Sequence, residues 1–167
     1  MTLTPLINTD PVIQLHIASA LLALLLGPIA LYRTRRDSLH RWTGYLWVGA
    51  MFTVALSSFW IHHFGVIGPF SPIHLLAVLT LWSLVDGMRH AFARRWEAHG
   101  LAMRALYWRG LAVAGLFTFL PGRVFNRMFF PEMPELGYGV IALCGGAVFA
   151  VALRTAPLRS LKRGQAA

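Results

Sequence analysis

Four of the seven histidines in this 167-residue chain recur at two heights on four apolar segments. His16 and His74 each lie about one turn inside the start of such a segment, whereas His40 and His99 each lie where a segment begins. Consecutive helices of an antiparallel bundle alternate in direction. We therefore expect His16 and His74 near one surface of the bundle, and His40 and His99 near the other.

Paired imidazoles of this kind favour axial ligation of a heme iron. A heme b between helices needs two facing imidazoles, an apolar slot for the porphyrin, and basic or polar groups for its propionates. We predict that His16 and His74 bind an outer heme and that His40 and His99 bind an inner one. About 16 residues, or roughly 24 Å of helix, follow His16 in its segment. The two hemes would therefore form an electron path between the two surfaces.

Three arginines are candidate partners of the bound cofactor. Arg109 lies near the middle of its apolar segment, where a lone charge costs on the order of 3 kcal/mol. It must snorkel, pair with Asp86, or bind a propionate or an anionic substrate, although Asp86 also has Arg89 as a local partner. Arg123 and Arg127 follow a helix break on the outer side. They fit heme propionates and lipid headgroups equally well.

The same histidines have interpretations without a metal. Interfacial histidines such as His16 and His74 often hydrogen-bond a neighbouring helix or a headgroup, although ionisable groups inside membrane segments are usually functional. His40 and His99 lie beside arginines, so simple exposure to the cytoplasm also accounts for them. The number of hemes is therefore two, one or none, with two favoured by the pairing.

The inner pair has two further alternatives. His90 competes with His99 as the second inner ligand. A fourth span shifted to residues 110–130 would leave His99 in water, where it could not ligate an embedded heme. His62 and His63 are better explained as interfacial residues than as ligands of an outer metal or substrate.

The elements that must position these residues are five apolar segments. A hydrocarbon layer roughly 30 Å thick needs about 20 apolar residues per helix. The sequence predicts an all-α fold: a polytopic membrane helix bundle of about five transmembrane helices, of which the first four form the core. It forms one domain over residues 1–167, with helices at about 12–32, 41–62, 73–89, 98–121 and 138–153 and a basic tail at 154–167.

Charge sets the predicted orientation. Basic residues concentrate between the first and second helices, between the third and fourth, and in the tail. By the positive-inside rule that face is cytoplasmic, so the amino terminus lies outside and the carboxy terminus inside. The chain is 57% hydrophobic with a net charge of +9. Most of its tryptophans are assigned to interfacial belts: Trp42, Trp47, Trp60, Trp96 and Trp108.

Several classes of function are disfavoured. The basic residues lie between apolar segments instead of in an aromatic-rich patch, so no nucleic-acid partner is expected. Cys144 is the single cysteine, which gives no thiol pair for redox or metal chemistry. The first apolar run lacks a basic leader and reads as a retained helix instead of a signal peptide. No nucleotide-binding, zinc-protease or serine-hydrolase motif is present.

Alternating histidines on four helices resemble the cytochrome b561 superfamily, whose diheme members carry electrons across membranes from ascorbate, superoxide or quinol. A closer resemblance, over nearly the whole chain, is to a family of small prokaryotic membrane proteins of unknown function. Four features carry it: the run from His16 to Gly27-Pro28, the segment Leu39-His40-Arg41-Trp42-Thr43-Gly44, His74, and the run from His99 to Met103-Arg104. A fifth helix after the core, instead of before it, departs from the superfamily pattern.

The sequence favours a b-type cytochrome of the bacterial inner membrane, a membrane oxidoreductase. It would transfer electrons between a small donor or acceptor outside and quinone or a redox partner inside. The alternatives are a heme-free structural or accessory subunit of a larger membrane complex, or a small transporter. The donor, the acceptor and whether the chain forms homo-oligomers stay open.

Overall fold

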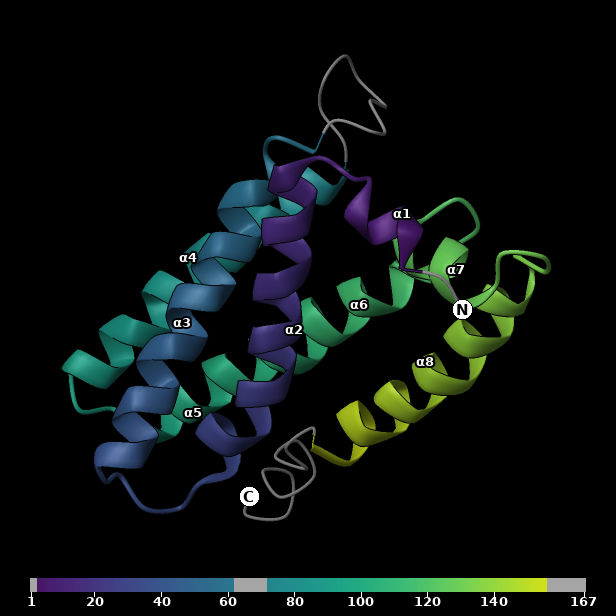
Figure 1. Cartoon of the computed structure of the whole chain (residues 1–167). Helices are drawn as coiled ribbons and strands as arrows, with labels where there is room; N and C mark the ends of the chain where they lie inside the picture. The colour runs from purple at the N-terminus through teal and green to yellow at the C-terminus, as the bar shows by residue number, and fades with distance from the viewer. Residues whose placement is uncertain (1–2, 62–71, 156–167) are drawn as a thin grey trace.

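The computed structural model describes residues 3–61 and 72–155, and within them every regular element is helical. Figure 1 shows the chain as a bundle of helices, the all-α class that the apolar segments predict. The elements are α1 (Thr4–Ile7), α2 (Pro11–Tyr32), α3 (Ser38–Ser58), α4 (Pro72–Phe92), α5 (Trp96–Ala105), the π-helix η1 (Leu106–Ala112), α6 (Val113–Phe117), α7 (Val124–Phe129) and α8 (Leu136–Thr155).

The long elements follow the five apolar segments closely. α5, η1 and α6 are continuous and form one helical rod over residues 96–117, where the sequence predicts a helix at 98–121. The largest differences are at carboxyl ends, where α3 stops at 58 instead of 62 and the rod stops at 117 instead of 121. The chain turns at 118–123, where Gly122 adopts a φ of 83° that side chains other than glycine rarely accept.

Acidic caps fix where the first two long helices begin. The Asp10 carboxylate accepts from the backbone N–H of Val12 at 2.7 Å, and Pro11 fills the first helical position. The Asp37 carboxylate accepts from the N–H of His40 at 3.1 Å. Such caps satisfy donors that the first turn leaves unpaired. α3 therefore begins at Ser38, three residues before the start expected from the apolar run.

Three helices, α2, α3 and α4, and the rod at residues 96–117 form the four-membered core of the bundle. α2 packs on α3, α3 on α4, and α4 on α5, while η1 contacts both α2 and α4. In the described part of the chain, α2 and α4 share no comparable interface, and neither do α3 and α5, so each pair lies diagonally. We call the end where α2 stops and α3 begins the inner end, following the predicted orientation, and the opposite end the outer end.

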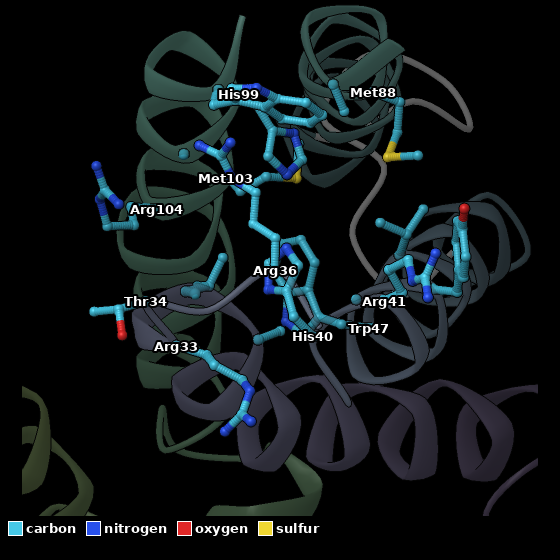
Figure 2. A pocket seen from close by; sticks show the side chains of 18 of the residues that line it. Arg33, Thr34, Arg36, His40, Arg41, Trp47, Met88, His99, Met103 and Arg104 are labelled. Atoms are coloured by element: carbon cyan, nitrogen blue, oxygen red, sulfur yellow. The ribbon is translucent and has the colours of Figure 1, made fainter. Parts of the chain in front are cut away.

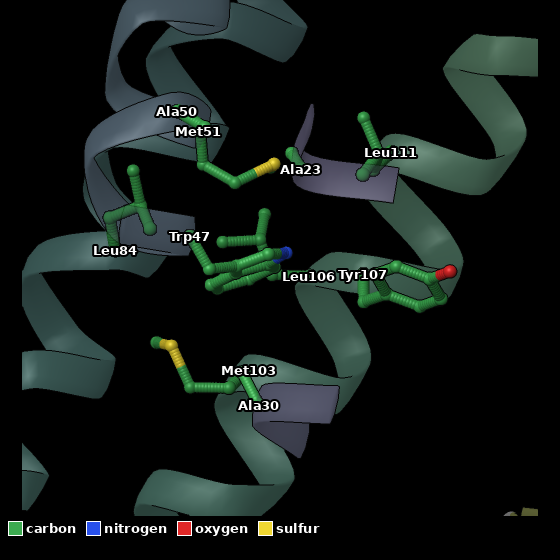
Figure 3. Close-up of a cluster of buried hydrophobic side chains, with 10 residues drawn as sticks. All are labelled: Ala23, Ala30, Trp47, Ala50, Met51, Leu84, Met103, Leu106, Tyr107 and Leu111. Carbon is green, nitrogen blue, oxygen red and sulfur yellow. The ribbon is translucent and has the colours of Figure 1, made fainter. Parts of the chain in front are cut away.

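A cluster of buried side chains holds the four core elements together (Figure 3). Trp47 of α3, which is only 1% exposed, lies in the centre with Met51. Leu84 of α4 and Leu106 of η1 pack around them. The assignment of Trp47 to an interfacial belt is wrong, because its ring fills the space between the helices.

A proline inside α2 is compensated by the neighbouring rod. Pro28 has no N–H, so the carbonyl of Leu24 loses its usual partner four residues on. The Tyr107 hydroxyl of η1 donates to that carbonyl at 3.1 Å. The Tyr107 ring lies where a Cβ at Gly27 would stand, so only glycine admits it. The Gly27-Pro28 pair and Tyr107 thus form one mid-bundle contact.

α8 packs mainly on α6 and η1, and Figure 1 shows it standing apart from α3 and α4. Asn126 of α7 is fully buried and joins the segments around it. Its amide nitrogen donates to the carbonyls of Phe119 and Pro134, both at 2.8 Å. A Cβ at Gly137 would clash with the Phe119 carbonyl. These contacts fix the turn that leads into α8.

The surface of the bundle that faces away from the core is strongly apolar. Pro11–Tyr32 and His74–Phe92 are long and apolar enough to cross a membrane, and Leu136–Ala150 is a shorter apolar helix. Large side chains point away from the core on these helices, including Leu25 at 72%, Trp82 at 73% and Leu143 at 79% exposure. An apolar surface of this extent marks contact with a membrane or with other chains.

Candidate functional site

The inner end of the bundle contains a cavity of about 440 Å³. It is lined by the end of α2, the 33–36 loop, the first turns of α3 and α5, and the end of α4. His40 and His99 both line it, together with Trp47 and Met103 (Figure 2). The structure therefore brings the predicted inner pair together at one cavity.

His99 is oriented by a backbone acceptor on the neighbouring helix. Its Nδ1 lies 2.8 Å from the carbonyl oxygen of Gly87 in α4. Because a carbonyl only accepts, Nδ1 carries the proton, and the lone pair of the imidazole is on Nε2. The same tautomer is common in metal-bound histidines, whose second nitrogen donates to a carbonyl. Gly87 is buried, and the Met103 methyl lies where its Cβ would stand.

His40 presents a nitrogen that the described residues leave unsatisfied. Its Nδ1 is buried without a hydrogen-bond partner, and so is Nε1 of Trp47, two turns further along α3. Buried polar atoms in native structures nearly always have a partner, and leaving one unpaired costs about 1–3 kcal/mol. His40 therefore has a ring nitrogen whose hydrogen-bonding capacity is unused at the cavity, whereas the Trp47 ring belongs to the buried core cluster.

Four arginines give the cavity a strongly basic lining: Arg33, Arg36, Arg41 and Arg104. No acidic side chain is among the lining residues in the described part of the chain. Arg33 is paired with Asp37, which lies just outside the lining. The Arg33 guanidinium and the His40 backbone N–H hold the pKa of the Asp37 carboxyl well below its usual range. The remaining positive charge favours a ligand with anionic groups.

Arg36 spans the cavity from the loop between α2 and α3. Its guanidinium carbon lies 4.2 Å from the centroid of the Trp96 ring in α5, a cation–π distance. Figure 2 shows this side chain between His40 and His99 in the view. A group seated between the two imidazoles would therefore meet Arg36 directly.

The structure separates His90 from this cavity. His90 Nε2 lies 3.4 Å from Oδ2 of Asp86, one turn earlier on α4, and His90 is not among the lining residues. The local partner of Asp86 is therefore His90 instead of Arg89. His99 lies in the first turn of the rod at 96–117, so a helix shifted to 110–130 does not form.

The outer histidines already have partners within the protein. His16 Nδ1 of α2 lies 2.9 Å from the Ser57 hydroxyl of α3. The Ser57 hydroxyl donates its own proton to the Thr53 carbonyl at 2.7 Å. His16 Nδ1 is therefore the donor to Ser57, which leaves the imidazole lone pair on Nε2. His74 is only 6% exposed, and its ring centroid lies 5.9 Å from that of Phe59. The two histidines lie at the same end of diagonal helices.

The three other candidate arginines lie away from the inner cavity. Arg109 is an exposed residue of η1 and lines a separate hollow, together with Asp86. Arg123 directly precedes α7 and is half-buried, and Arg127 is an exposed residue of α7. α7 packs against α1, which belongs to the outer end. His62 and His63 fall outside the described residues.

Protein side chains alone form no larger ligand cluster in the ranges that the structure describes. There, no group of three or more His, Cys, Asp or Glu side chains is placed to hold a metal ion. The relevant donors are therefore the histidine pairs described above.

A family model described as "Predicted membrane protein (DUF2306)" matches residues 13–154. The chain belongs to the DUF2306 family. No curated protein and no solved structure matches this DUF2306 chain. The family supports a membrane protein, in keeping with the apolar helices. The comparisons show no link to the cytochrome b561 superfamily, so that resemblance rests on the spacing of the histidines.

Two contributors to the site were missed by sequence reasoning. Gly87 supplies the acceptor for His99, and Trp96 receives Arg36. No sequence motif marks the contact between Gly87 and His99, because it depends on how the two helices pack against each other. The contact between Arg36 and Trp96 was only weakly indicated by the sequence, which puts an aromatic residue at the start of one helix on the same predicted side as an arginine-rich loop.

Proposed function

We propose that this DUF2306 protein is a multi-pass protein of the bacterial inner membrane that binds heme b and carries electrons across the bilayer. The electrons would pass between a small donor or acceptor outside and quinone or a redox partner inside. The observation that supports this most is the inner cavity. His40 and His99 reach it from diagonal helices, and a buried ring nitrogen of His40 lacks a partner in the described residues.

The residue types that line the cavity support this proposal. His99 has its lone pair on Nε2 because Gly87 holds Nδ1, and His40 has an unsatisfied ring nitrogen. Ala30, Val48 and Met103 add apolar wall. When bound, a heme supplies one-electron redox chemistry whose potential depends on its axial ligands and on burial.

The basic residues have a separate role in this proposal. Arg36, Arg41 and Arg104 line the cavity and would hold the anionic propionates by charge-assisted hydrogen bonds. Arg36 would exchange its contact with Trp96 for a propionate. By the positive-inside rule, the arginines between α2 and α3 also support a cytoplasmic position for this end.

The outer site is proposed on weaker grounds. His16 Nε2 keeps its lone pair, and His74 is buried at the same end of the bundle. Arg123 and Arg127 would serve propionates there, since α7 packs on α1 at that end. We expect heme at the inner site first, because its arginines and the unpaired ring nitrogen of His40 are better matched to the cofactor.

The test is a visible spectrum of the purified protein with pyridine-hemochrome quantification. We expect reduced-minus-oxidised bands of bis-imidazole heme b at one or two hemes per chain. His40→Ala and His99→Ala should each remove the inner heme, whereas His90→Ala is a matched control on the same end and should retain it. Folded protein without such bands would refute the proposal and favour a heme-free accessory subunit or a transporter.

A further inference from the structure

A second hollow lies between α4 and the rod of α5 and η1, and it has no lining residue in common with the inner cavity. Its volume is also about 440 Å³. Leu76, Leu79, Trp82 and Leu106 give it apolar walls, and Asp86 and Arg109 place charges in it. The hollow therefore combines a lipid-like lining with two side chains that are costly in an apolar environment.

Arg109 has no counter-charge within the described residues. No hydrogen bond or ion pair of its guanidinium is found there, and the side chain is exposed from η1. A lone arginine in an apolar helix is costly and usually marks a functional position. It lies within a π-helical stretch, a departure from α-helix that recurs at functional sites.

Asp86 places a negative charge in the same hollow. Its side chain is 51% exposed, and Oδ2 lies 3.4 Å from His90 Nε2, one turn nearer the inner end. Asp86 and Arg109 form no ion pair with each other in the described structure, although both line the hollow. Each therefore keeps hydrogen-bonding capacity for a ligand between them.

The pair of charges selects the chemistry of that ligand. An anionic lipid headgroup would be attracted by Arg109 but repelled by Asp86. A cation would be attracted by Asp86 but repelled by Arg109. A neutral quinol ring satisfies both, because its hydroxyls can accept from Arg109 and donate to Asp86. The exposed Trp82 ring adds an aromatic face of the size that such a ring stacks on.

We propose that this hollow binds the head of a membrane quinol, reached from the lipid. Arg109 donates to one hydroxyl oxygen of the quinol, and Asp86 accepts from a hydroxyl of the same ring. Trp82 and the leucines cover the ring. The binding site stands on its own residues, whereas its role as the inner electron donor or acceptor rests on the proposed function.

The test measures binding of a radiolabelled short-chain ubiquinol, kept reduced under anaerobic conditions, to the protein in phosphatidylcholine nanodiscs. We expect saturable binding that Arg109→Gln and Asp86→Asn each weaken at least tenfold. Arg89→Gln lies on the same helix outside the hollow, and it should bind as wild type. Ser83→Phe fills the hollow without a change of charge and should also abolish binding, with circular dichroism confirming that each variant is folded.

Two outcomes overturn the site. One is wild-type affinity in both charge variants, and the other is displacement of the ubiquinol by added phosphatidylglycerol, which would make the hollow a headgroup site. Binding needs no heme, so the two proposals fail separately. Intact binding in protein without heme bands supports the hollow and rejects electron transfer, whereas heme bands with no ubiquinol binding reject only the hollow.

Discussion

The two ends of the bundle have the same kind of histidine pair in different surroundings. At the inner end, His40 and His99 open onto one basic cavity, and a ring nitrogen of His40 lacks a partner. At the outer end, Ser57 already accepts a hydrogen bond from His16, and His74 packs beside Phe59. Equal spacing in the sequence therefore does not make equal sites, because the helices between the histidines decide what space is left.

The largest difference between the ends should appear on removal of the ligands. We expect the double variant His40→Ala/His99→Ala to lose its inner heme completely, since both axial donors are gone. His16→Ala/His74→Ala should leave that heme in place. The measurement is heme content per folded chain by pyridine hemochrome. Equal losses in both double variants would show that the two ends do not act as separate sites.

A second difference concerns packing at the inner end. Gly87→Val places a branched side chain where the Met103 methyl lies and displaces the acceptor of His99. We expect destabilisation of about 1–3 kcal/mol from overpacking, together with weaker heme retention. Thermal unfolding in detergent gives the stability. Gly49→Val is the matched control, because nothing lies within 4 Å of a Cβ added at Gly49. An equal loss of stability in Gly49→Val would show that overpacking against Met103 is not the cause.

At the outer end we expect a smaller effect from Ser57→Ala. The substitution removes the acceptor that His16 donates to at 2.9 Å. A hydrogen bond of this kind contributes about 1 kcal/mol, so the melting temperature should fall by a few degrees. The inner heme should keep its potential in a redox titration. A shift of the inner potential instead would mean that the two ends are coupled.

The smallest expected effect is a pH dependence confined to the inner end. The pKa of Asp37 is lowered in the folded protein by Arg33 and by the backbone N–H of His40. The resulting stability is therefore present above the unfolded pKa of about 3.9 and is lost as pH falls through the lower folded value. Melting temperatures below about pH 4 should decline less in Asp37→Asn than in wild type. Identical melting-temperature profiles of Asp37→Asn and wild type in this pH range would exclude Asp37 as the cause of the acid destabilisation.

The helices were predictable because each is an apolar run bounded by turn residues and charges. The early start of α3 was not, because it depends on the Asp37 carboxylate reaching the N–H of His40. Periodicity also could not reveal the π-helix at Leu106–Ala112, since it differs from an α-helix in hydrogen bonding and not in residue pattern.

The site was predictable in part for a similar reason. Matched heights placed His40 and His99 at the same end, and the structure puts both at one cavity. The roles of Gly87 and Trp47 depend on packing between helices, which residue types alone do not specify. Trp47 shows the limit clearly, since residue type alone assigns a tryptophan of an apolar helix to an interfacial belt as readily as to the core, where the structure puts it.

The contact of Tyr107 with Gly27 and the Leu24 carbonyl has a consequence for distance control. The Tyr107 ring packs against Gly27, and its hydroxyl donates to the Leu24 carbonyl, which Pro28 cannot use. This contact fixes the axial position of α2 relative to the rod. Neither helix can slide along its axis without breaking it. The axial offset between His16 on one helix and His99 on the other is therefore coupled to this contact, and under the proposed function that offset would set the separation of the two hemes.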